Sequence, residues 1–122
     1  MPTPENVMET YVAIWNATDE EERRRLAQEA LTDDALVVYP TIHASGRAET
    51  VAAIGRFQQQ MPGARFVETS GVERHHGWLR ASWRLLGTDG TVRLEGEDVA
   101  EQSPDGRLCR VIGFHNPLPQ PA

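Results

Sequence analysis

The sequence contains no lysine, because all twelve of its basic residues are arginines. Schiff-base chemistry and pyridoxal phosphate attachment both need a lysine amine, so both are excluded. Cysteine occurs once, as Cys109, which excludes an internal disulfide and a cysteine-based zinc cluster and suits a reducing compartment. No apolar run approaches the roughly 20 residues that a membrane helix needs. We therefore expect a cytoplasmic protein without a membrane segment.

Acidic residues outnumber basic ones, and the formal net charge is -6, which disfavours a nucleic-acid partner. A glycine-rich phosphate loop, a serine nucleophile elbow and helical histidine pairs are all missing, so we expect no cofactor and no metal. His75 and His76 are neighbours on an expected strand end, where alternation should point them to opposite faces. The 122 residues suffice for one domain with a core. We predict a single domain over 1–122, with an ordered core over about 4–116 and a proline-rich tail at 117–122.

The order of the local signals predicts helices first and strands after them. Thr3 and Pro4 are typical of an N-cap and a first helical position, and this helix should end near residue 17. Thr18 is expected to start a second helix, with Glu21 completing a capping box. Further elements are a strand at 35–39, a loop containing His43, a helix at 47–60, and strands at about 65–74 and 107–115. This order indicates an α+β domain whose helices cover one face of a curved sheet.

The segment from residue 76 to residue 100 reads as two strands joined by a tight turn at 87–90. A period of two puts one apolar face on each strand, and Asp98 falls on that face. An even-numbered turn would pair Trp83 with Leu94, Ala81 with Gly96 and Leu79 with Asp98, which leaves a gap between two small residues. Charged residues, namely Arg80, Glu95 and Glu97, are expected on the opposite face. A carboxyl on a buried face must be hydrogen-bonded or protonated, which is typical of a functional site.

Five phrases of the sequence resemble motifs of the SnoaL-like branch of the nuclear transport factor 2-like superfamily. They are YVAIWNATDEEERRRL, YPTIHASGRAETVAAI, MPGARF, ASWRLLGTDG and EGEDVAEQSPDGRLCRVIGF, and together they span nearly the entire chain. The resemblance implies a cone-shaped, strongly curved, mostly antiparallel sheet with three helices covering its concave face. It also implies a homodimer through the outer sheet face and a pocket for a small apolar or polyketide/steroid-like molecule.

Ketosteroid isomerase, one member of this superfamily, allows a comparison of single residues. Tyr11 resembles the oxyanion-hole tyrosine of that enzyme, and Asp98 resembles its protonated aspartic acid. The other interpretation of Tyr11 is a core tyrosine whose hydroxyl binds the backbone. Where the isomerase has a general-base aspartate before a proline, this sequence has Tyr39 before Pro40. Tyrosine ordinarily has a pKa near 10 and is a poor base at neutral pH, so the usual steroid isomerisation is not expected.

His115 is the candidate for the missing proton-transfer group, provided that it faces inward. Alternation along the last strand allows two arrangements: Cys109, Val111, Gly113 and His115 inward, or Leu108, Ile112 and Phe114 inward. Histidine ordinarily titrates close to neutral pH, which suits it to proton transfer. In the second arrangement His115 would meet solvent.

The sequence therefore predicts a protein that binds a small, largely apolar molecule, with proton-transfer chemistry of the isomerase, cyclase or dehydratase type. The alternatives are a non-catalytic carrier or sensor and a dimerisation module with a filled cavity. The catalytic candidates are Asp98, Tyr11 and His115. The candidates for ligand binding are Trp15, Tyr39, His43, Ile54, Phe57, Leu79, Ala81, Trp83, Leu94 and Gly96.

Overall fold

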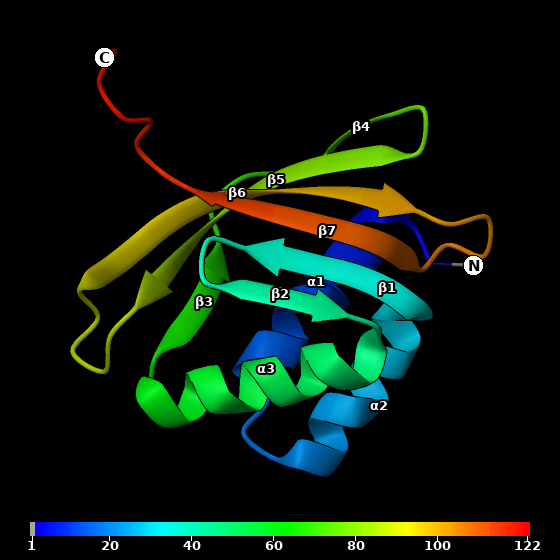
Figure 1. The fold of residues 1–122 in the computed structure, drawn as a ribbon, viewed down its shortest axis with the longest axis horizontal. Helices are drawn as coiled ribbons and strands as arrows, with labels where there is room; N and C mark the ends of the chain where they lie inside the picture. Colours follow the sequence, from blue (N-terminus) through cyan, green and yellow to red (C-terminus); the bar gives the residue numbers. More distant parts are fainter. Residues whose placement is uncertain (1) are drawn as a thin grey trace.

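The computed structural model describes residues 2–122 and contains three helices and seven strands (Figure 1). The helices are α1 (Pro4–Asn16), α2 (Glu20–Ala30) and α3 (Arg47–Gln60). The strands are β1 (Leu31–Tyr39), β2 (Ile42–Ser45), β3 (Arg65–Glu68), β4 (Glu73–His75), β5 (Trp78–Leu86), β6 (Val92–Gln102) and β7 (Leu108–His115). No helix of this part of the chain is both long and apolar enough to cross a membrane.

The strands form one open, mixed sheet in the order β2-β1-β7-β6-β5-β3, and β4 also pairs with β5. Only β1 and β7 run parallel among the pairs of residues 2–122, and every other pair is antiparallel. Figure 1 shows the three helices gathered on one side of this sheet. The predicted α+β class, with a mostly antiparallel sheet covered by helices on one face, is confirmed.

The helix starts agree with the sequence patterns at α1 and differ at α2. Thr3 caps α1 as expected, since its hydroxyl accepts the Asn6 backbone N–H at 3.1 Å. The prediction that Thr18 caps α2 is wrong. Asp19 takes that place, and its carboxylate accepts the Glu22 N–H at 3.0 Å, because a charged acceptor matches the positive end of a helix better than a hydroxyl does.

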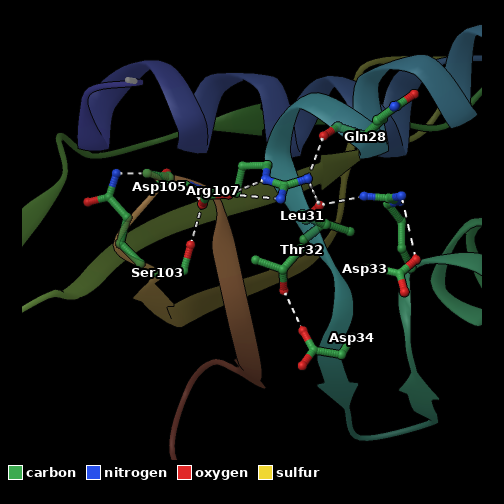
Figure 2. Close-up of polar contacts among 11 residues, drawn as sticks. Gln28, Leu31, Thr32, Asp33, Asp34, Ser103, Asp105 and Arg107 are labelled. Atoms are coloured by element: carbon green, nitrogen blue, oxygen red, sulfur yellow. Dashed lines mark hydrogen bonds and ion pairs between the residues drawn. The ribbon is translucent and has the colours of Figure 1, made fainter.

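Helix α2 also ends without a loop, and β1 begins directly at Leu31 instead of at residue 35. The last turn of α2 has no basic residue of its own, so distant arginines bind its free carbonyls. Arg107 reaches the carbonyl oxygens of Gln28 and Leu31 at 3.5 Å each (Figure 2). Arg47, at the start of α3, donates to the same Leu31 carbonyl at 3.0 Å. The helix end is therefore joined to α3 and to the turn before β7, through contacts that local sequence patterns do not reveal.

The register of the β5–β6 hairpin differs from the prediction by two residues. Trp83 pairs with Gly96, Ala81 with Asp98 and Leu79 with Ala100. A connection of five residues, 87–91, supplies one residue of the difference, and a bulge between Leu85 and Leu86 supplies the other. Because the total shift is even, the side chains from Leu79 to Leu85 and from Leu94 to Ala100 keep their predicted faces. The expected gap is absent: the Trp83 indole lies over Gly96, where a Cβ atom would overlap the ring.

Two other segments depart from their predicted structure. The expected loop around His43 is strand β2, and the expected strand at 65–74 is divided into β3 and β4. His76 leaves the strand with a φ of 51°, so alternation stops there. The rings of His75 and His76 consequently meet, with their Nδ1 atoms 3.2 Å apart, instead of pointing to opposite faces.

Strand β7 turns Val111, Gly113 and His115 toward the helices. Val111 is fully buried and Phe114 is 58% exposed on the other face. The strand departs from strict alternation at its start, since a register shift near Gln102 brings Leu108 into the core. The inward arrangement therefore holds for three of its four predicted residues, and Cys109 is the exception, because its thiol lies beside Glu101.

Candidate ligand-binding cavity

A cavity of about 80 Å³ lies between α1, α3 and the helix-covered face of the sheet. Its walls are largely aromatic and aliphatic, and Asp98 is the only acidic group among its lining residues. The residues around it are Tyr11, Val12, Trp15, Tyr39, Thr41, Ile42, Phe57, Phe66, Trp83, Leu94, Asp98 and His115. Sites that bind small molecules typically have such an apolar wall with a few converging polar groups.

The polar end of the cavity is formed by three side chains from different elements. Tyr11 projects from α1, and its hydroxyl oxygen lies 2.6 Å from that of Tyr39, at the end of β1. Asp98 projects from β6 and accepts the Trp83 indole N–H at 3.1 Å. At Gly113 a Cβ atom would overlap the Tyr39 ring and lie 2.8 Å from the Asp98 carboxylate. Glycine on β7 is thus what lets Tyr39 and Asp98 approach each other.

Burial changes the proton affinity of the Asp98 carboxyl. The side chain is 4% exposed, and loss of solvation raises its pKa to about 7, against smaller lowering interactions with Tyr39 and Trp83. Neither Tyr39 nor Trp83 is a cation, so neither compensates the negative charge of an ionised Asp98. Asp98 therefore changes its protonation state near neutral pH, whereas an ordinary aspartic acid is fully ionised there.

The two tyrosines keep their protons throughout the physiological range. Burial and the nearby Asp98 carboxyl raise the pKa of Tyr11 and of Tyr39 well above the ordinary tyrosine value. Tyr39 is consequently a hydroxyl donor and acceptor, not a general base. Tyr11 is buried as the sequence suggested, but its hydroxyl binds Tyr39 and not the backbone.

An aromatic cluster forms the rest of the wall. Trp15 packs edge-to-face against Tyr39, Phe57 and Phe66 at ring-centroid distances of 5.3, 5.6 and 5.4 Å. The His115 ring stands perpendicular to Trp83 at 6.2 Å and lines the same cavity as Asp98. The structure therefore brings together Tyr11, Asp98 and His115, the three residues that the sequence singled out as catalytic candidates.

Eight of the thirteen predicted site residues line this cavity and five do not. Ile54 and Leu79 are core residues, 0% and 2% exposed. Ala81 and Gly96 are buried on the sheet, and Gly96 is covered by the Trp83 ring. His43 lies on β2 and faces a separate, more polar depression beside Arg56 and Gln60. These five predicted ligand-binding residues therefore do not line this cavity.

Four lining residues were not predicted: Val12, Thr41, Ile42 and Phe66. Thr41 and Ile42 lie at the β1–β2 turn, where a loop was expected, so no facing direction could be assigned to them. Phe66 is on β3, a strand whose alternation is too short to indicate a face. Val12 follows Tyr11 directly in the sequence, and only this position next to a predicted site residue could have indicated that it lines the cavity.

The comparisons with known proteins bear on the family and the fold. No family model matches the sequence, and none of the curated proteins matches it either. Among solved structures, a SnoaL-like family protein of Agrobacterium tumefaciens, provisionally described as an isomerase, is 33% identical over 95% of this chain and 100% of its own, with a TM-score of 0.89. Two more distant structures share the fold. A provisionally assigned SnoaL-like polyketide cyclase of Jannaschia is 14% identical over 95% of this chain and 90% of its own, with a TM-score of 0.71. A protein with a cystatin-like fold from Methylobium petroleophilum is 17% identical over 96% of this chain and 78% of its own, with a TM-score of 0.76. The chain belongs to the SnoaL-like family.

Proposed function

We propose that the cavity binds a small, largely apolar molecule with an oxygen atom at the Tyr11–Asp98 end, and that its residues transfer a proton on that molecule. One observation carries the proposal: a buried carboxyl with a pKa of about 7 stands at the end of an otherwise apolar, aromatic cavity. Burying a carboxyl disfavours its charged form and costs free energy. Carboxyls with a perturbed pKa in a cleft are typical of proton-transfer sites.

The hydroxyl groups give Asp98 an indirect path to the ligand. When Asp98 is protonated it can donate toward Tyr39, Tyr39 can donate to Tyr11 across their 2.6 Å contact, and the Tyr11 proton is then free for a ligand oxygen. When Asp98 is ionised, the direction of donation reverses and Tyr11 no longer offers its proton. The titratable groups that face Asp98 are Tyr11 from α1, Tyr39 from β1 and, across the cavity, His115 from β7.

His115 supplies the base in this arrangement. A carbon-bound proton next to a ligand carbonyl moves to a ring nitrogen of His115, and the electron pair of the C–H bond moves to the carbonyl oxygen. Tyr11 stabilises the resulting enolate by hydrogen bonding. In a β,γ-unsaturated ketone, return of the proton from His115 to the γ-carbon gives isomerisation. In a β-hydroxy ketone, the enolate re-forms the carbonyl as the β-hydroxyl leaves with that proton as water, which gives dehydration.

The cavity volume limits the size of the ligand. An engineered cavity of roughly 150 Å³ binds benzene, and the present cavity of about 80 Å³ is smaller. A single ring fits only with a small movement of its walls, and a steroid nucleus would need a large one. We therefore favour monocyclic or acyclic ketones over the steroid-like molecules that the resemblance suggested.

Proton exchange in heavy water tests this function. Cyclohexanone incubated with the protein should exchange its α-hydrogens for deuterium faster than in buffer, as followed by proton NMR. His115→Gln should abolish the acceleration, and Asp98→Asn should reduce it. His43→Gln, which alters a histidine outside the cavity, should leave it unchanged. Equal exchange with and without protein would overturn the catalytic proposal.

The second candidate function is a carrier or sensor without turnover. It is favoured by Tyr39, which occupies the position of the carboxylate base and stays protonated. In that case cyclohexanone would bind, but the protein would not accelerate the exchange of its α-hydrogens.

We also propose a homodimer through the outer sheet face. On this face Val38, Ile112 and Val99 lie side by side on β1, β7 and β6, and Phe114 beside them is 58% exposed. Several charged side chains there are already paired within the chain, as in Arg84–Glu95 at 2.8 Å and Arg110–Glu101 at 3.6 Å, so an approaching copy would meet less uncompensated charge.

A further inference from the structure

The Trp15 indole N–H is a buried donor without an acceptor. Trp15 is 7% exposed, and its Nε1 atom has no hydrogen-bond partner within residues 2–122. Buried polar groups in folded proteins are nearly always bonded, so each exception needs an explanation. The other cavity tryptophan is different, because the Trp83 indole N–H donates to Asp98 at 3.1 Å.

The Trp15 side chain lies beside Tyr11 in the wall of the cavity. Trp15 follows Tyr11 by one helical turn on α1, so both side chains project from the same helix face, and both line the cavity. A hydrogen-bonding interaction with the indole lowers the pKa of Tyr11, against the larger raising effect of burial, so the N–H lies toward the Tyr11 hydroxyl although the two groups do not meet hydrogen-bond geometry.

The indole is held in place by its neighbours. Three aromatic rings contact it edge-to-face, at centroid distances of 5.3 to 5.6 Å. A ring enclosed in this way cannot turn its N–H toward another acceptor without displacing Tyr39, Phe57 or Phe66. The donor is therefore oriented before any ligand arrives, which reduces the entropy lost on binding.

We propose that the Trp15 indole N–H selects ligands that carry a carbonyl-type oxygen, which it binds together with the Tyr11 hydroxyl. A carbonyl oxygen has two lone pairs and no proton, so it can accept from both donors of α1 at once. The ligand class is thus ketones, aldehydes or esters, and hydrocarbons of the same shape are discriminated against. This inference rests on the proposed small-molecule binding and adds a specificity-determining residue to it.

A pair of probes with the same shape tests the inference. Cyclohexanone and methylenecyclohexane differ in whether an oxygen or a CH₂ group is attached to the ring, and they are titrated into ¹⁵N-labelled protein. The chain has three tryptophans, so three indole N–H signals are expected, and Trp15→Phe identifies the one from Trp15. Cyclohexanone should move that signal downfield and bind more tightly than methylenecyclohexane, and the Trp15 hydrogen bond should account for about a tenfold part of this preference.

The variants separate the hydrogen bond from general packing. Trp15→Phe should lower the preference for cyclohexanone about tenfold and leave the part that is due to Tyr11, whereas Trp78→Phe, outside the cavity, should retain the full preference. Equal affinity for both probes with an unmoved Trp15 signal in the wild type would overturn the inference and leave small-molecule binding intact. Binding of neither probe would overturn the proposed function as well.

Discussion

The hydroxyl oxygens of Tyr11 and Tyr39 lie 2.6 Å apart, although the residues are 28 positions apart in the chain. Their contact joins α1 to the end of β1 directly beside the buried carboxyl of Asp98. Tyr39 touches both partners, since its hydroxyl also lowers the pKa of Asp98. This hydroxyl is therefore the link between the ionisable group and the donor that faces the cavity.

Replacing Tyr39 with phenylalanine should raise the pKa of Asp98 above its value of about 7, because the carboxylate loses one of its two stabilising side chains. Carbon NMR of the aspartate carboxyls measures this change. Tyr11→Phe is the matched control: it also breaks the hydroxyl pair, but it leaves both side chains that lower the pKa of Asp98 in place, so the shift should be smaller. An equal shift in both variants would contradict the assignment of Tyr39 as the link.

The stability of the protein should depend on pH through Asp98. Its pKa is about 7 in the folded state and roughly 4 in the unfolded chain, so the folded state holds the proton more tightly. The contribution of Asp98 to the free energy of unfolding is therefore greatest below about pH 4. As the pH rises to about 7, this contribution, on the order of 4 kcal/mol, is lost.

Urea unfolding of the wild type and of Asp98→Asn between about pH 4 and 8 tests this dependence. The amide keeps an oxygen for the Trp83 N–H and does not titrate, so the difference between the two proteins isolates Asp98. Exposed acids with a lowered pKa, such as Asp105 and Glu22, act in the opposite direction and cancel in that difference. A difference that is constant with pH would contradict the raised pKa.

Gly113→Ala should destabilise the fold by roughly 1–3 kcal/mol through overpacking, because the new methyl group would overlap the Tyr39 ring. The same change should also disturb the contact between Tyr39 and Asp98. Gly71→Ala is the control, since a Cβ atom at Gly71 meets no atom within 4 Å. Thermal unfolding compares the two, and equal stabilities would show that the close approach at Gly113 is unimportant.

The proposed dimer should respond to charge on the outer sheet face. Phe114→Asp should shift the protein toward the monomer in sedimentation equilibrium at micromolar concentration, because it buries an unpaired carboxylate at the interface. Leu118→Asp changes an exposed apolar residue beyond the sheet, 81% exposed, and should have no effect. A wild-type monomer under the same conditions would refute the dimer.

Much of the fold followed from local patterns. The period of two placed Asp98 and Trp83 on the helix-covered face, and the limits of α3 agree with the predicted helix. The hairpin register did not follow, because the five-residue connection 87–91 and the bulge between Leu85 and Leu86 together shift the pairing by two residues. The direct passage from α2 to β1 depends on Arg107 and Arg47, which contact that helix end only in the folded chain.

The sequence predicted those site residues that stand out as single polar side chains on an apolar face. It could not predict which apolar residues line the cavity, because that depends on packing. Asp98 and Tyr11 stand out because a polar group interrupts an apolar face. Ile54 on α3 and Leu79 on β5 also lie on apolar faces, but both are buried in the core, and no sequence pattern separates a core residue from a residue of the cavity wall. The sequence also left the direction of His115 open, since both faces of β7 are apolar. The absence of cofactors and metals and the cytoplasmic location stay predictions.

The most direct test of the proposed site is the titration of the Asp98 carboxyl by carbon NMR, without ligand and with saturating cyclohexanone. The buried carboxyl should titrate with a pKa of about 7 in the free protein. Bound ketone should raise that pKa further, because an oxygen that accepts from Tyr11 favours the protonated form of Asp98. A pKa near 4 that the ketone leaves unchanged would contradict both the buried carboxyl and its link to the ligand.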